Sequence, residues 1–247
     1  MNLKYITCSD PRNYNTIYEL FDLWDIDPRV EIAVQMHPGK VSPDTERYKW
    51  IRGLIDGLYI HKQEYNLAIH VNNDWCDDIC NGVIPAALEP LFNASSYYKS
   101  RPLVQRIQLN MPKHTAENFN AQKLKPVIDS YNDKEFIIQY KPTTVAAVDA
   151  LHKSGTRFSL LFDESGGKGR DASAWRAPIF PGQHLQGYSG GMSPENVADN
   201  LTKISRVADG HDIWIDAEGK LKRDDKFDIG RAKQYIQNAL RWDEKQR

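Results

Sequence analysis

The chain opens with Leu3-Lys4-Tyr5-Ile6-Thr7-Cys8-Ser9-Asp10-Pro11, a run of strand-forming residues that ends in a turn without glycine. Tyr, Ile and Thr favour extended backbone, and Asp-Pro favours a turn. An open doubly wound sheet usually carries a glycine-rich turn after its first strand. A closed barrel of parallel strands has no such requirement. The turn at Cys8–Pro11 therefore favours the barrel.

Apolar, β-branched runs recur along the rest of the chain and alternate with segments of helical periodicity. This alternation predicts a parallel sheet with right-handed crossovers, and eight strands allow the sheet to close. The length of 247 residues is near the roughly 250 typical of a (β/α)8 barrel. We therefore predict a single (β/α)8 domain over residues 1–247. The predicted strands are Leu3–Thr7, Val30–Met36, Asn66–Val71, Val104–Asn110, Glu135–Tyr140, Arg157–Phe162, His184–Ser189 and Asp212–Ile215. The predicted helices are Thr16–Leu23, Glu46–Leu58, Ala121–Tyr131, Thr143–His152, Pro194–Val207 and Ile229–Leu240.

Composition excludes several classes of protein. The formal net charge is −1, so the basic surface that nucleic acids require is missing. No stretch approaches 18 apolar residues, so we predict no membrane span. The three cysteines, Cys8, Cys76 and Cys80, are an odd number, which argues against a disulfide framework and favours the cytoplasm. Cys76 and Cys80 share one helix face near His70 but no second pair of ligands exists, so we predict neither a metal nor another cofactor.

Functional residues of a barrel lie just after its strands. This rule selects Cys8 as a thiolate base or nucleophile and Asp163 as an acid or base. It also selects the basic, glycine-rich segment 166–170 as a lid. After the seventh strand it selects Gly190-Gly191 as an anion site, because a helix start is predicted just beyond them at Ser193-Pro194-Glu195. Each has a structural alternative: an inert cysteine, a loop-capping carboxylate, a surface loop, and a plain helix cap of the kind also predicted at Ser42-Pro43-Asp44.

Two of these motifs resemble those of phosphoribosylanthranilate isomerase, a tryptophan-biosynthesis enzyme of the phosphate-binding (β/α)8 class. Leu160-Leu161-Phe162-Asp163, followed by Gly166-Gly167-Lys168-Gly169 and Trp175, is similar to the family's sixth strand and its loop. The stretch Ser189–Val197 is similar to the family's phosphate loop almost residue for residue. Weaker similarities extend over the whole barrel, but only these two stretches are specific.

The resemblance implies an Amadori rearrangement, which isomerises an aminated aldose phosphate to the ketose without a cofactor. In the family an aspartate after the sixth strand protonates the ribose ring oxygen, and a cysteine after the first strand takes the proton from C2. The matching residues here are Asp163 as acid and Cys8 as base. The resemblance also assigns phosphate binding to Gly190, Gly191, Ser193 and Gly219, and substrate binding to Lys40, Gly166, Gly167 and Lys168.

The chain departs from the family pattern after the eighth strand. The family has two small hydroxyl residues before a glycine, whereas here Ala217 and Glu218 precede Gly219. Glu218 would repel a phosphate unless its side chain turns away. Two alternatives to the isomerase therefore stay open: a diverged barrel that binds another ligand, with or without phosphate, and a barrel that binds a partner without catalysis. The expected partner is a small anionic molecule, and the sequence predicts no oligomeric state.

Overall fold

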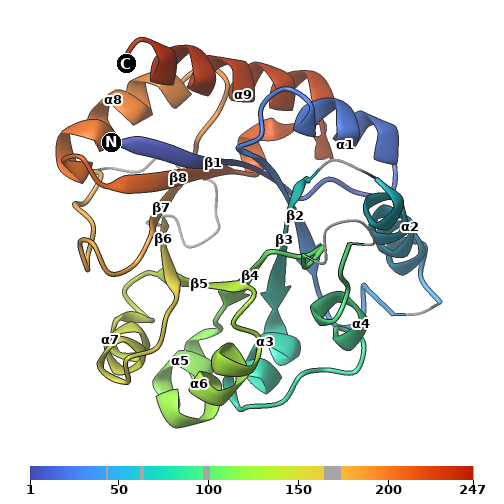
Figure 1. Cartoon of the computed structure of the whole chain (residues 1–247), viewed down its shortest axis with the longest axis vertical. Coiled ribbons are helices and arrows are strands. Elements are labelled where there is room, and N and C mark those ends of the chain that lie inside the picture. Colours follow the sequence, from blue (N-terminus) through green and yellow to red (C-terminus); the bar gives the residue numbers. More distant parts are fainter. Residues whose placement is uncertain (43, 62–63, 97–100, 164–173, 247) are drawn as a thin grey trace. The chain divides into compact units, whose positions relative to one another are not determined.

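The computed structural model describes residues 1–42, 44–61, 64–96, 101–163 and 174–246. Eight parallel strands follow one another in chain order, β1 to β8, and form a closed barrel with helices between the strands (Figure 1). The prediction of a (β/α)8 barrel is thus confirmed. The strands are β1 (Asn2–Ser9), β2 (Val30–Met36), β3 (Asn66–Asn72), β4 (Arg106–Asn110), β5 (Glu135–Tyr140), β6 (Ser159–Asp163), β7 (Gln186–Ser189) and β8 (Asp212–Ala217).

The helices that follow the strands include all six that periodicity predicts, with shifted ends. Thr16 caps the first of them, since its side chain accepts the Glu19 N–H and the Glu19 carboxylate accepts the Thr16 N–H. The helices are α1 (Ile17–Trp24), α2 (Glu46–Ile60), α3 (Asn73–Cys80), α4 (Glu89–Phe92), α5 (Lys113–Glu117), α6 (Ala121–Ser130), α7 (Val145–Lys153), α8 (Val197–Ala208) and α9 (Ile229–Glu244).

Both predicted serine caps are wrong. Helix α8 begins at Val197 after Asn196, because the Asn196 side chain accepts the N–H of Ser193 and closes a turn before the helix. Helix α2 begins after Thr45, whose hydroxyl accepts the Tyr48 N–H. At Ser42 the capping role passes to Thr45, whereas at Ser193 the hydroxyl does accept the Glu195 N–H, but residues 194–196 form a turn that precedes the helix.

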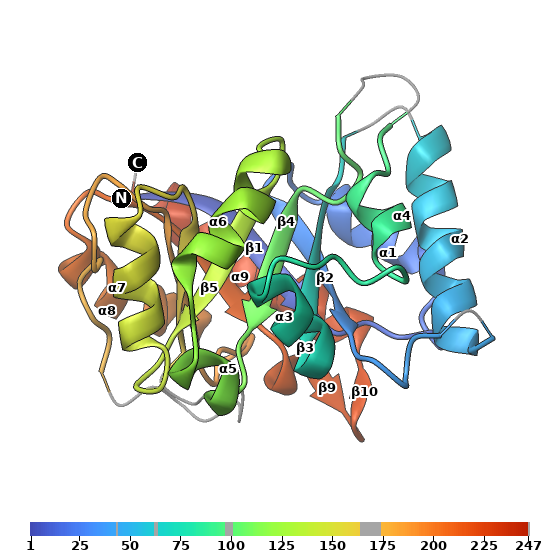
Figure 2. The same cartoon turned by 90° about the horizontal axis from the view of Figure 1, so that it is seen from below.

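A short 3-10 helix, η1 (Gly219–Leu221), and a two-stranded hairpin follow β8. The hairpin strands are β9 (Lys222–Arg223) and β10 (Lys226–Phe227), which pair antiparallel (Figure 2). Asp224 and Asp225 join them with φ values of 49° and 59°. Two successive left-handed residues are what a two-residue hairpin turn of the favoured type needs, and Asp tolerates that conformation.

Contacts within the chain form two compact units. Unit 1 is Met1–Ala33 with Leu160–Arg247, and unit 2 is Val34–Ser159. In unit 1, α9 packs on β1 and also contacts α1, α8 and η1. In unit 2, α3, α6 and α7 pack beside one another and cover β3, β4 and β5. The assignment of the whole chain to a single domain stays a prediction.

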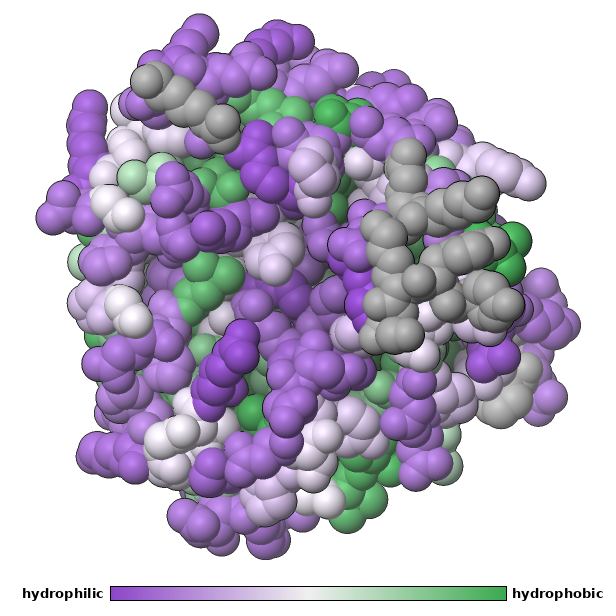
Figure 3. All heavy atoms as spheres, viewed as in Figure 1, coloured by the Kyte–Doolittle hydropathy of each residue, from purple (hydrophilic) through white to green (hydrophobic). Residues whose placement is uncertain are grey.

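The surface seen in Figure 3 is mainly hydrophilic, with apolar side chains in small scattered groups. The large apolar side chains that stand exposed among the described residues are Tyr14, Tyr18, Tyr59, Ile60 and Val83. None of the described helices combines the length and the apolar character that crossing a membrane requires.

Candidate active site in unit 1

Carboxyl and hydroxyl side chains alternate across the strands of unit 1. Thr7 on β1 lies in register with Glu31 on β2 and with Asp216 on β8. On the other side of β8, Asp163 on β6 is in register with Ser189 on β7. Residues in register on parallel strands face the same side of a sheet, so these five side chains form one row near the carboxyl ends of the strands.

Asp216 is the centre of this row. It is buried, and Ser9 Oγ donates to its Oδ1 at 2.5 Å. Burial raises the pKa of Asp216 to about 8, against the opposing effect of the Ser9 hydrogen bond. Asp216 is therefore largely protonated at pH 7 and can donate a proton. The neighbouring carboxylates whose charges add to the rise in its pKa are Glu218, Glu31 and Asp163.

Asp163 closes the row on β6 and is also buried. Strand β7 alone separates its strand from that of Asp216. With strands roughly 5 Å apart, the two Cα atoms lie on the order of 10 Å from each other. Ser189 on β7 lies between the two carboxyl groups in the row. Glu31, at the other end of the row, accepts a 2.7 Å hydrogen bond from the Thr7 hydroxyl.

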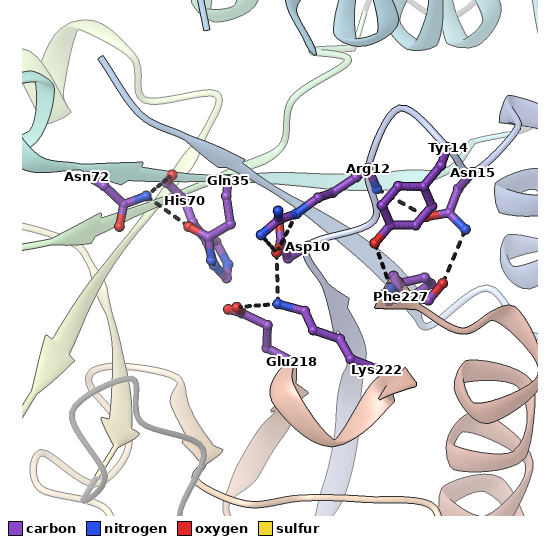
Figure 4. Close-up of polar contacts among 10 residues, drawn as sticks. All are labelled: Asp10, Arg12, Tyr14, Asn15, Gln35, His70, Asn72, Glu218, Lys222 and Phe227. Carbon is purple, nitrogen blue, oxygen red and sulfur yellow. Dashed lines mark hydrogen bonds and ion pairs between the residues drawn. The ribbon is translucent and has the colours of Figure 1, made fainter. Parts of the chain in front are cut away.

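A second group of charges lies beyond the ends of β1 and β8 (Figure 4). Arg12 and Lys222 both donate to Oδ2 of Asp10, at 2.7 and 2.9 Å. Lys222 Nζ also donates to Glu218 Oε1 at 3.1 Å. Although burial alone would raise it, the hydrogen bonds from Arg12 and Lys222 lower the pKa of Asp10 below its usual value. We call these four residues the charged quartet.

The hairpin that carries Lys222 is hydrogen-bonded to the segment that carries Arg12. Phe227 N donates to the Tyr14 hydroxyl at 2.7 Å, and Asn15 Nδ2 donates to the Phe227 carbonyl at 3.4 Å. Asn15 Oδ1 in turn accepts the N–H of Arg12 at 3.1 Å. The positions of the two cations are therefore linked through the backbone as well as through Asp10.

Cys8 lies on the opposite face of β1 from Thr7 and Ser9, because side chains alternate along a strand. It is fully buried, and burial, with the charge of Asp216, raises the pKa of its thiol well above the usual value. The structure therefore does not bring Cys8 onto the face that carries Asp163. A neutral, buried thiol is a poor base.

The predicted phosphate loop follows β7. Gly190 and Gly191 have φ values of 117° and 65°, which glycine adopts without strain. The Ser193 N–H donates to Asn196 Oδ1 at 2.8 Å, and Ser193 Oγ accepts the Glu195 N–H at 3.2 Å. Two groups that a phosphate would use are thus already bonded within the loop.

The remaining predicted ligand residues are spread over the chain. Gly219 is exposed at the start of η1. Lys40 is exposed in the loop after β2, within unit 2. Gly166, Gly167 and Lys168 lie outside the described residues, as does the rest of the predicted lid at 166–170. Substrate binding by these residues stays a prediction.

Unit 2 carries a chain of amide side chains at the ends of β2, β3 and β4. Each member donates to the next: Gln108 to Asn110, Asn110 to Asn72, Asn72 to Gln35 and Gln35 to His70 Nδ1, over 2.8 to 3.4 Å. Because Gln35 Oε1 accepts from Asn72, its nitrogen must donate to His70. The His70 proton then sits on Nε2. Figure 4 shows three members of this chain, Gln35, His70 and Asn72.

Sequence reasoning missed the parts of the site that depend on register. Asp216 lies one residue past the predicted eighth strand, Asp212–Ile215, and Glu31 lies inside a predicted strand where apolar residues are usual. The signal that could have found them is polarity on one face of β1, at Thr7 and Ser9, and on one face of β2, at Glu31 and Gln35. The sequence gives no signal for Lys222, because a two-residue strand has no periodicity, or for Arg12, because it lies in the loop after β1. Among the residues that the structure describes, no group of three or more His, Cys, Asp or Glu side chains could hold a metal ion.

Comparison with known proteins gives the fold. No family model matches the chain, and no curated protein matches it. N-(5'-phosphoribosyl)anthranilate isomerase from Pyrococcus furiosus matches 96% of this chain over 98% of its own, with a TM-score of 0.52 and 10% sequence identity. A mutant tryptophan synthase alpha-subunit from the same organism matches 96% of this chain over 97% of its own, with a TM-score of 0.53 and 11% identity. A citrate lyase from Burkholderia xenovorans matches 97% of this chain over 78% of its own, with a TM-score of 0.53 and 12% identity. At these identities the similarity shows the fold alone: the chain is a (β/α)8 barrel.

Proposed function

We propose that the chain is an isomerase that interconverts an anionic aldose derivative and its ketose, with Asp216 and Asp163 as the acid–base pair. The observation that supports this most directly is the pKa of Asp216, raised to about 8 by burial and neighbouring carboxylates. Such a carboxyl group keeps its proton at pH 7 and can still give it up. The reaction type comes from the sequence resemblance, with an aminated sugar phosphate such as phosphoribosylanthranilate as the first substrate to test.

The chemistry needs an acid and a base on different sides of one sugar. Asp216 donates its proton to the ring oxygen, the C1–O bond breaks, and its electron pair stays on that oxygen. The amine nitrogen forms a double bond to C1. Asp163 then takes the proton from C2, and the enolamine that forms tautomerises to the ketone. This assignment makes Asp163 the base instead of the acid, and it replaces Cys8, because Cys8 is neutral and faces the helices.

The test compares Asp216→Asn and Asp163→Asn with the wild type, using phosphoribosylanthranilate and following its conversion to the ketose. Loss of a general acid or base costs about 10²- to 10⁴-fold in rate, so both variants should lose kcat by that factor. Asp212→Asn is the matched control, because Asp212 lies on the same strand at its other end. Wild-type activity should fall as pH rises through about 8.

Two outcomes would change the assignment. If Asp216→Asn keeps wild-type activity while a folded Cys8→Ala loses it, the thiol is the base after all. If the wild type shows no turnover of the phosphorylated substrate, a second candidate replaces it: an isomerase of a ligand without phosphate. That candidate is favoured by the Ser193 amide, which already donates to Asn196.

A further inference from the structure

The structure points to Arg12 and Lys222 as the groups that bind a carboxylate of the substrate, in the place that Glu218 takes when no substrate is bound. We propose this as an extension of the proposed function, because it names the group by which the substrate of the Asp216–Asp163 pair is held. The two sites are adjacent in the chain. Ser9, which bonds Asp216, precedes Asp10, and Glu218 follows Asp216 by two residues, just past the end of β8.

Asp10 holds both cations in place. Its side chain is 3% exposed, and a single oxygen, Oδ2, accepts from Arg12 Nε and Nη2 and from Lys222 Nζ. Its backbone has a φ of 67°, a left-handed conformation that Asp tolerates. Because this carboxylate is buried and accepts hydrogen bonds from two cations, a ligand in water does not readily displace it. Asp10 is therefore a positioning residue.

Glu218 differs from Asp10 in each of these respects. Its side chain is 41% exposed, and its Oε1 accepts from Lys222 Nζ at 3.1 Å, the longer of the two bonds that Lys222 makes to Asp10 and Glu218. Exposed ion pairs of this kind contribute little to stability, so exchange for another carboxylate costs little. The Arg12 side chain is 48% exposed and faces the same group of charges (Figure 4). A ligand carboxylate that replaces Glu218 would contact Lys222 and reach the guanidinium of Arg12.

The net charge of the quartet indicates which anionic group of a ligand it would bind. Two cations and two carboxylates make the charged quartet neutral. When Glu218 turns away, Arg12, Lys222 and Asp10 leave a single positive charge. One carboxylate neutralises it, whereas a phosphate dianion would leave an excess negative charge beside Asp10. The quartet thus fits a carboxylate better than a phosphate.

The experiment measures succinate binding by thermal unfolding and calorimetry, against inorganic phosphate, at constant ionic strength. Glu218→Gln removes the competing carboxylate and should tighten succinate binding about two- to five-fold, the range expected for an exposed ion pair. Lys222→Met, alone or combined with Glu218→Gln, should abolish the shift in Tm. Lys222→Arg should restore it in part, which separates loss of charge from loss of fold.

Two controls complete the design. Lys220→Met removes a lysine from the exposed η1 helix next to the quartet and should leave succinate binding unchanged. Gly191→Asp disrupts the loop after β7, where the resemblance puts phosphate, and should also leave succinate binding unchanged. The proposal is overturned if succinate binds Lys222→Met as well as the wild type, or if Glu218→Gln binds no tighter. It is also overturned if phosphate binds at Lys222 more tightly than succinate. These outcomes do not involve Asp216, so they are distinct from a failure of the catalytic assignment.

Discussion

Asp216 couples the chemistry of the site to the stability of the protein. Its pKa is about 8 in the folded state and about 3.9 in an unfolded chain. Since the folded state binds the proton more tightly, the stabilising contribution is complete below pH 4 and is lost as pH rises to 8. The same burial that prepares the acid therefore makes the protein less stable at alkaline pH.

We predict that the free energy of unfolding falls between pH 4 and pH 8 by up to about 1.4 kcal/mol per pH unit, the limit for one proton. Asp216→Asn cannot titrate and should remove most of this slope. Denaturant unfolding of both proteins at several pH values measures the difference, in which the other titrating groups cancel. Parallel pH dependence in the two proteins would mean that Asp216 is ionised in the folded state at pH 7.

Among the short elements, the hairpin of β9 and β10 has the largest consequence for the site, since it carries Lys222. Its fold depends on the β1–α1 segment, because Phe227 N donates to the Tyr14 hydroxyl. Sequence periodicity predicted all eight barrel strands because each has several alternating or apolar residues. It could not predict this hairpin, whose strands have two residues each.

We predict that Tyr14→Phe lowers the free energy of unfolding by about 1 kcal/mol, because the Phe227 N–H loses its acceptor. The loosened hairpin should also weaken succinate binding through Lys222. Tyr18→Phe is the control, because Tyr18 lies nearby in α1 and is 81% exposed. Equal stability of Tyr14→Phe and Tyr18→Phe would show that water replaces the hydroxyl and that the hairpin holds without it.

At the scale of the molecule, the closed barrel demands a filled interior as well as a polar row at its strand ends. In unit 1, Gly187 on β7 lies in register with Trp214 on β8, and a Cβ at Gly187 would come within 2.2 Å of the indole. The indole is buried, so it has little freedom to move. Glycine is required here for close approach of a large side chain.

Gly187→Ala should therefore destabilise the protein by about 1 to 3 kcal/mol, as expected of an overpacked core. Trp214→Leu in the same chain should recover part of the loss. Gly219→Ala is the control, because nothing lies within 4 Å of a Cβ at that position. Denaturant unfolding of the four proteins gives the comparison. A Gly187→Ala variant as stable as Gly219→Ala would show that β7 shifts to make room.

The sequence predicted the barrel because alternation of strands and helices is a property of the whole chain, which single residues do not alter. It predicted the site less completely. Asp163 follows from its place at the end of an apolar strand. The choice between Cys8 and Ser9 depends on a shift of one residue, which exchanges the two faces of β1. Only the register with β8 determines that Ser9, and not Cys8, contacts the buried acid.

The three cysteines are buried and free: Cys8 lies in unit 1, while Cys76 and Cys80 lie in unit 2. A thiol that is buried in the native state reacts with a reagent only after its surroundings open. Each unit of the protein therefore contains at least one native thiol that can be labelled when the unit opens. Mass-resolved labelling can time how often each unit opens, in the unmodified chain, without any engineered probe.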